Sequence, residues 1–220
     1  MNAATETVAI AGGAGRISTA YDAPDGAPRG IAVIAHPHPL YGGTRDNKVV
    51  QTIARALVAQ GYACWRPDFR GVSESEGTHD DGNGETEDLL AVVAHARATA
   101  GAALPLVLGG FSFGSFVQTR VAQRLAQAGQ PADRMVLVGV AASRFAVEPI
   151  PPESLVIHGE LDDVVPLGAV FEWARPLDLP IVVVPGADHF FHRRLGLLKR
   201  LVRESIVGSP PGTGAPAGSA

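Results

Sequence analysis

The chain has 220 residues, of which 46% are apolar and 18% charged, and a formal net charge of −4. This length suits one compact domain, and the composition is too hydrophobic and too weakly charged for a disordered chain. The acidic balance argues against a nucleic-acid partner, which would need a basic face, and no apolar run approaches the ~18 residues of a membrane span.

The first residues and the cysteine content indicate the cellular compartment. Residues 1–15 lack both a basic start and a sustained apolar run, so no signal peptide is predicted. The single cysteine, Cys64, cannot form an internal disulfide and stands in an apolar run, which fits a buried thiol in a reducing compartment. The sequence therefore predicts a cytoplasmic protein.

In chain order, the first predicted elements are two short strands at residues 7–11 and 16–21, joined by a glycine-rich turn as in a β-hairpin. Short apolar runs then alternate with segments of helical periodicity. The runs predict strands at residues 30–35, 63–66, 104–109, 135–140, 154–158 and 181–184. The helical segments are residues 46–60, 85–99, 113–128, 167–174 and 191–207.

This alternation predicts an α/β fold: a mainly parallel sheet between two layers of helices, with the N-terminal hairpin adding antiparallel strands at one edge. We expect a single domain over residues 1–207. Residues 208–220 consist of Gly, Pro, Ser, Thr and Ala only, and are predicted to be a flexible tail.

A G-x-S-x-G motif stands where a predicted strand meets a predicted helix, with Ser112 at its centre between Gly110 and Gly114. Such a sharp turn exposes the serine hydroxyl, and its glycines let neighbouring backbone pass without a clash. The position at the carboxyl end of a parallel strand is where open α/β sheets bind ligands. Ser112 is therefore the candidate nucleophile.

A serine nucleophile needs a basic partner and a carboxylate that orients this base, and the chain order typical of such a turn is serine, acid, histidine. Acids follow the strand at 154–158, where Asp162 and Asp163 are adjacent. Histidines follow the last strand, at His189 and His192. Because these segments follow different parallel strands, their side chains are expected to converge at one edge of the sheet.

These motifs together resemble those of α/β-hydrolases over residues 7–207. The sequence HPHPLYGG at residues 36–43 is similar to a subgroup of small bacterial members related to dienelactone hydrolases, and residues 68–75 look like the D-x-R-G-x-G-x-S loop of the family. Dienelactone hydrolases proper have a cysteine nucleophile, whereas this motif carries a serine. The family pattern H-G-x-x-D-x-x-V-P begins at His158 and implies Asp162 as the acid, with Asp163 next, and the G-x-x-H position implies His189 over His192.

The oxyanion of an acyl-transfer intermediate needs two hydrogen-bond donors. One is expected to be the backbone N–H of Phe113, the residue after the serine. The other should come from the loop after residue 35, where two prolines lack an N–H. The family resemblance points to the N–H of His38, with Leu40 next. No cofactor is predicted, and no metal site, because the His-x-His pair has no third ligand at a recognisable spacing.

About a dozen residues separate the strands at 135–140 and 154–158, where many α/β-hydrolases insert a lid. No cap or lid is therefore predicted, and the open site should take small, water-soluble esters or thioesters. Leu40, Tyr41, Phe111 and Phe113 are candidates to line an acyl pocket, and the alternative for the two phenylalanines is a place in the core.

The sequence thus predicts a serine esterase with Ser112, Asp162 and His189 as catalytic residues, acting on a small ester with water as the second reactant. A peptidase or amidase that uses the same residues is the alternative. A third interpretation is a non-catalytic relative that only binds a ligand. Nothing in the sequence predicts an oligomeric state.

Overall fold

The computed structural model describes residues 5–207, so the predicted tail at 208–220 lies outside the described residues. Within this range the strands are β1 (Glu6–Gly12), β2 (Gly15–Asp22), β3 (Gly30–Ala35), β4 (Tyr62–Pro67), β5 (Leu106–Phe111), β6 (Arg134–Val138), β7 (Leu155–Gly159) and β8 (Ile181–Val184). The helices are α1 (Lys48–Val58), α2 (Asn83–Ala100), α3 (Phe113–Gln127), α4 (Leu167–Ala174) and α5 (Leu195–Val207), with short 3₁₀ turns η1 (Pro39–Tyr41) and η2 (Arg175–Leu177).

The eight strands form one sheet in the order β1-β2-β4-β3-β5-β6-β7-β8. The pairs β1–β2 and β2–β4 are antiparallel and all other pairs are parallel, so the N-terminal hairpin forms one edge. Every residue of β3 and β5 is buried, which explains why these strands are continuous apolar runs with no polar alternation.

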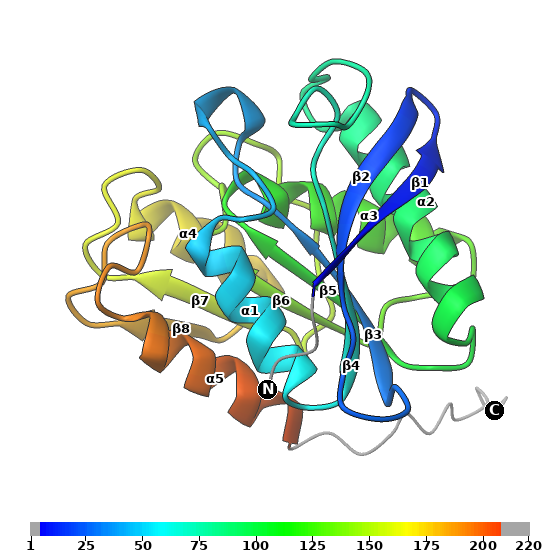
Figure 1. Cartoon of the computed structure of the whole chain (residues 1–220). Helices are drawn as coiled ribbons and strands as arrows, with labels where there is room; N and C mark the ends of the chain where they lie inside the picture. Colours follow the sequence, from blue (N-terminus) through cyan, green and yellow to red (C-terminus); the bar gives the residue numbers. More distant parts are fainter. Residues whose placement is uncertain (1–4, 208–220) are drawn as a thin grey trace, which may run out of the picture.

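Helices cover both faces of the sheet, as Figure 1 shows. One apolar core lies under α1 and α5, and contains residues such as Ile53, Phe191 and Leu198. The other lies under α2, α3 and α4, with Leu89, Val117 and Val170 among its members. The three-layer arrangement buries both faces of the parallel strands and leaves their carboxyl ends open for a site.

The structure differs from the sequence-based expectation at several element ends, most clearly at the last helix. This helix begins at Leu195 and not at residue 191, because Phe191 and Arg193 have positive φ angles of 54° and 60° that no helix accommodates. Strand β6 ends at Val138, two residues early, because Gly139 turns the chain with φ 56°. Among residues 5–207, no helix combines the length and the apolar character that a membrane crossing requires.

Candidate active site

Ser112 lies at a strained turn between a strand and a helix. It joins the end of β5 to the start of α3 with φ 55° and ψ −119°, a conformation that few non-glycine residues adopt. A Cβ on Gly110 would lie 2.6 Å from the Cα of Ser115. A Cβ on Gly114 would lie 2.5 Å from the carbonyl oxygen of Ala35. Both glycines are therefore sterically required, and they hold the serine at the carboxyl edge of the sheet.

His189 and Asp162 reach the same edge from the ends of β8 and β7. Nε2 of His189 lies 3.1 Å from Oγ of Ser112, and Nδ1 of His189 lies 2.7 Å from Oδ2 of Asp162. The three residues are buried, with 8%, 2% and 7% of their surface exposed for Ser112, His189 and Asp162. The structure thus brings the three predicted residues into one hydrogen-bond chain, an arrangement that can move a proton from a hydroxyl to an imidazole.

The alternative residues lie outside this chain of hydrogen bonds. Asp163 is exposed, and its neighbour Asp162 is the residue that reaches the imidazole of His189. His192 is also exposed and pairs with Asp188 at 2.6 Å. The geometry therefore favours Asp162 over Asp163 and His189 over His192.

Asp162 is surrounded by hydrogen-bond donors. Its Oδ1 accepts the backbone N–H groups of Val164 at 3.0 Å and Val165 at 2.7 Å, while Oδ2 faces His189. Burial tends to raise the pKa of this carboxyl, but the hydrogen bonds from His189 and Val165 and the two nearby imidazoles outweigh it, so the pKa of Asp162 lies below its ordinary value. Asp162 is therefore ionised near neutral pH and fixes the N–H of the imidazole on Nδ1.

His158 supports the loop that carries Asp162. It is fully buried, and its Nε2 donates to the carbonyl of Val165 at 2.9 Å and lies 3.4 Å from Oδ2 of Asp162. Burial lowers the pKa of His158, so the ring is neutral near pH 7. The sequence showed His158 only as the first position of a family pattern, and its contact with the acid could not be seen there.

The ring of His189 is confined from two sides. A Cβ on Gly139 would lie 3.2 Å from Cε1 of His189, and the ring of Phe111 lies 4.9 Å from the imidazole, centroid to centroid. Phe111 is fully buried, so the prediction that it lines an acyl pocket is wrong: its ring packs behind the imidazole and offers no surface to a substrate. Phe113, 1% exposed, is likewise a core side chain.

The loop after β3 is rigid and anchored. The side chain of His38 caps η1 by accepting the N–H of Leu40 at 3.3 Å, and its carbonyl accepts the N–H groups of Tyr41 and Gly43. His36 is fully buried and accepts the backbone N–H of Phe69 at 2.9 Å, which ties this loop to the one after β4. Burial lowers the pKa of His36 to about 4, so its ring is neutral and serves as an anchor.

This loop lies directly against the serine turn. The rings of His38 and Phe113 are 4.8 Å apart, and Gly114 packs against the carbonyl groups of residues 35 and 36. Among the hydrogen bonds of residues 5–207, neither the N–H of His38 nor that of Phe113 has an acceptor. The N–H of Leu40 is already directed at the side chain of His38, so the first two groups are the better donors for a ligand oxygen.

Apolar side chains are exposed next to the site residues. Leu40 is 70% and Tyr41 76% exposed on the loop that contains His38, and Phe190, adjacent to His189, is 43% exposed. The connection at residues 139–154, where a lid would be inserted, contains neither helix nor strand. Exposed apolar side chains therefore lie next to the site residues, and no helix or strand is inserted at the 139–154 connection.

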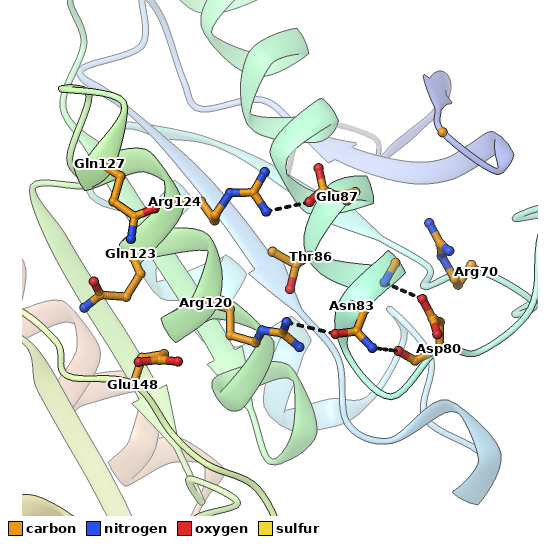
Figure 2. Close-up of a pocket in the computed structure, with 12 residues that line it drawn as sticks. Arg70, Asp80, Asn83, Thr86, Glu87, Arg120, Gln123, Arg124, Gln127 and Glu148 are labelled. Carbon is orange, nitrogen blue, oxygen red and sulfur yellow. Dashed lines mark hydrogen bonds and ion pairs between the residues drawn. The ribbon is translucent and has the colours of Figure 1, made fainter.

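A second concavity of about 590 Å³ lies between α2 and α3, and Ser112, Asp162 and His189 do not line it (Figure 2). Apart from two glycines, all its lining residues are polar or charged. Three arginines face three carboxylates: Arg70, Arg120 and Arg124 against Asp80, Glu87 and Glu148. A cleft lined by polar and charged side chains suits an acyl chain poorly, and it contains none of the three residues of the hydrogen-bond chain.

The sequence matches the model of the Hydrolase_4 family, described as serine aminopeptidase, S33, over residues 26–166, more than half of the chain. The chain belongs to this family. A serine hydrolase without a lid from Xanthomonas campestris is 32% identical, covers 97% of this chain and 98% of its own, and superposes with a TM-score of 0.86.

Two further relatives resemble the chain over most of its length. An α/β serine hydrolase homologue from Coxiella burnetii is 34% identical over 91% of this chain and 97% of its own, with a TM-score of 0.78. A protein of Rickettsia prowazekii described as uncharacterized is 28% identical over 202 residues, which is 88% of this chain and 85% of the relative. The protein is thus a lidless α/β serine hydrolase, as predicted. Its likeness to dienelactone hydrolases in particular stays a prediction.

Proposed function

We propose that this hydrolase cleaves small carboxylic esters or thioesters through a covalent acyl-enzyme on Ser112. The observation that carries the proposal is the hydrogen-bond chain from Ser112 through His189 to Asp162, at 3.1 and 2.7 Å. A serine hydroxyl is a weak nucleophile by itself, and an imidazole oriented by a carboxylate is the means by which such hydroxyls are activated.

In the first half-reaction, Oγ of Ser112 attacks the carbonyl carbon of the ester while its proton passes to Nε2 of His189. The negative charge that develops on the carbonyl oxygen is stabilised by the N–H groups of Phe113 and His38. Asp162 stabilises the imidazolium and keeps its orientation. When the intermediate collapses, His189 returns the proton to the leaving alkoxide or thiolate, and the acyl group remains on Ser112.

In the second half-reaction, His189 removes a proton from water, which attacks the acyl carbon. The second tetrahedral intermediate uses the same two N–H groups. Its collapse releases the carboxylic acid, and the proton on His189 returns to Oγ of Ser112. The cycle needs no redox partner, and the two reactants are the ester and water.

The open site supports small substrates. Leu40 and Tyr41 provide apolar surface at the rim, but the connection at residues 139–154 adds no helix or strand to enclose a long acyl chain. A lipid tail would stay largely exposed to water, so little of its transfer free energy would be gained on binding. A short acyl group has little apolar surface to leave in water, so an open site disfavours it least.

Labelling with a fluorophosphonate probe, combined with a short-chain aryl ester assay, tests the proposal. We expect the wild type to be labelled and active, and Ser112→Ala to lose labelling and more than about 10³-fold of kcat/KM. Ser143→Ala, an exposed serine on the 139–154 connection, is the matched control and should retain both. Labelling that persists in Ser112→Ala contradicts the proposal, and a wild type that neither labels nor turns over favours a non-catalytic binding protein.

Amide hydrolysis by the same residues is the alternative that the description of the family raises. A peptide must be held along its length while the amine is protonated and leaves, and the 139–154 connection offers no inserted element for that purpose. A matched pair of substrates, the ester and the anilide of one acyl group, separates the two activities. A higher kcat/KM on the anilide than on the ester would favour amide hydrolysis as the function.

A further inference from the structure

A further histidine–carboxylate pair, His79 with Glu85, joins the loop between β4 and α2 to the first turn of α2. Glu85 is fully buried, and its Oε1 accepts the Nδ1–H of His79 at 2.7 Å and the backbone N–H of Asp80 at 3.0 Å. Its Oε2 accepts the N–H of Gly82 at 2.9 Å. The carboxylate therefore organises the loop around itself and fixes the orientation of the His79 ring.

The ring of His79 packs against the two residues whose N–H groups we assign to the oxyanion. Its centroid lies 5.4 Å from that of Phe113, edge to face, and 4.8 Å from that of His38. The side chain of His79 is only 10% exposed, so its neighbours enclose most of the ring. Among residues 5–207, no other imidazole ring packs against the rings of both Phe113 and His38.

The same loop is fixed on its other side. The carboxylate of Asp80 accepts the N–H of Gly84 at 3.0 Å, and the amide of Asn83 donates to the carbonyl of Asp80 at 3.1 Å. Arg120 of α3 donates to the side-chain oxygen of Asn83 at 2.9 Å (Figure 2). Helix α3 begins directly after Ser112, so the loop that carries His79 is tied to the element that carries the nucleophile.

From this geometry we infer that His79, oriented by Glu85, is a positioning residue for the oxyanion hole. The inference rests on the proposed function. His79 does not take part in proton transfer, since its Nε2 faces Asp81 at 3.3 Å and not the serine. Its ring holds the His38 loop and the Phe113 turn at the separation at which their two N–H groups can bind one oxygen.

Loss of the His79 ring should destabilise the transition state more than the bound substrate. A donor in an oxyanion hole contributes about 10²–10³ in rate, and a displacement near 1 Å is enough to lose a large part of it. The ground-state ester carries no oxyanion and gains little from the same donors. Loss of the ring should therefore lower kcat and leave KM nearly unchanged.

Three substitutions at His79 separate the ring from the hydrogen bond. His79→Ala removes both, His79→Phe keeps a ring against Phe113 and His38, and His79→Asn keeps an N–H donor for Glu85 without a ring. The matched control is His95→Ala, which removes a partly exposed imidazole from α2 without touching the loop. Each variant is assayed for kcat and KM on an aryl acetate, for Ki of a trifluoromethyl ketone that forms a tetrahedral adduct with serine, and for melting temperature.

We expect His79→Ala and His79→Asn to lose about tenfold in kcat with KM within about threefold, and Ki of the ketone to rise by the same factor as kcat/KM falls. His79→Phe should recover most of the loss, and His95→Ala should match the wild type. Wild-type kcat and Ki in His79→Ala would overturn the inference. So would activity retained in His79→Asn but lost in His79→Phe, because the ring would then not be the group that matters.

The two proposals fail in different ways. If the wild type is not labelled at Ser112, the proposed function fails before the variants are compared. If the wild type is labelled and His79→Ala does not fold, His79→Phe and His79→Asn still test the positioning role. The first keeps the ring contacts, and the second keeps the hydrogen bond to Glu85. Equal kinetic constants in these two folded variants would overturn the positioning role.

Discussion

Asp162 controls which nitrogen of His189 carries the proton. Its Oδ2 accepts the Nδ1–H of the imidazole, which leaves the lone pair of Nε2 pointing at Ser112. An asparagine at this position can still accept the N–H groups of Val164 and Val165 through its oxygen. Its amide nitrogen would then face Nδ1 and donate to it, which moves the imidazole proton to Nε2.

For Asp162→Asn we therefore expect a folded protein with the wrong tautomer of His189 and a kcat lowered by about 10³–10⁴. The melting temperature should stay within a few degrees of the wild type, about the effect of one kcal/mol. Asp163→Asn is the control, because that neighbouring carboxylate is exposed and does not reach the imidazole. Equal loss of activity in both variants, or none in Asp162→Asn, would contradict the assignment of the acid.

At the scale of elements, the site depends on how closely α3 approaches the end of β3. Gly114 is the point of contact, since a Cβ there would lie 2.5 Å from the carbonyl oxygens of both Ala35 and His36. Backbone atoms cannot move aside as a flexible side chain can. A methyl group at this position must therefore push the helix away from the loop that carries His38.

Gly114→Ala is expected to destabilise the fold by about 1–3 kcal/mol and to lower kcat, because the two oxyanion donors lie on the segments that are pushed apart. Gly196→Ala in α5 is the matched control: apart from its chain neighbours and the backbone of its own helix, no atom lies within 4 Å of the added Cβ, and alanine favours a helix over glycine by about 0.5–1 kcal/mol. Urea unfolding and ester kinetics measure the two effects. A Gly114→Ala variant as stable and active as the wild type would show that the contact is not tight.

The serine turn was predictable because local sequence and global fold agree there. A fully apolar strand, two glycines around Ser112 and a helical period afterwards all indicate the same turn, and the structure has it at those residues. The start of α5 was not predictable in this way. Its preceding segment holds Phe191 and Arg193 at positive φ without a glycine to mark it, so the helical period extended into a turn.

Contacts between loops were the part of the site that the sequence could not indicate. The role inferred for His79 depends on two ring contacts and one buried carboxylate, which join residues of three separate segments. The sequence carries only an acidic stretch before a helix, which has the ordinary explanation of a helix N-terminus. Phe111 shows the converse: its position beside the serine indicated a pocket, whereas the sheet buries its ring.

At the scale of the molecule, stability should depend on pH through buried neutral histidines. Burial lowers the pKa of His36 from 6.5 to about 4 and that of His158 in the same direction. Below pH 6.5 the unfolded chain binds protons at these positions and the folded chain does not, so the free energy of unfolding falls as the pH falls. Each such group contributes a slope of about 1.4 kcal/mol per pH unit within its window.

For His36 the window runs from pH 6.5 down to about 4, and the expected loss is on the order of 3 kcal/mol. The buried Asp68, whose pKa is raised by its burial, opposes this loss only at the acid end. Urea unfolding at pH 7, 6 and 5 measures the effect, and His36→Gln is the comparison: an amide that can still accept the N–H of Phe69 but does not titrate. We expect His36→Gln to be less stable at pH 7 and to show a shallower decline towards pH 5. A free energy of unfolding that is constant from pH 7 to 5 in the wild type would contradict the lowered pKa values of His36 and His158.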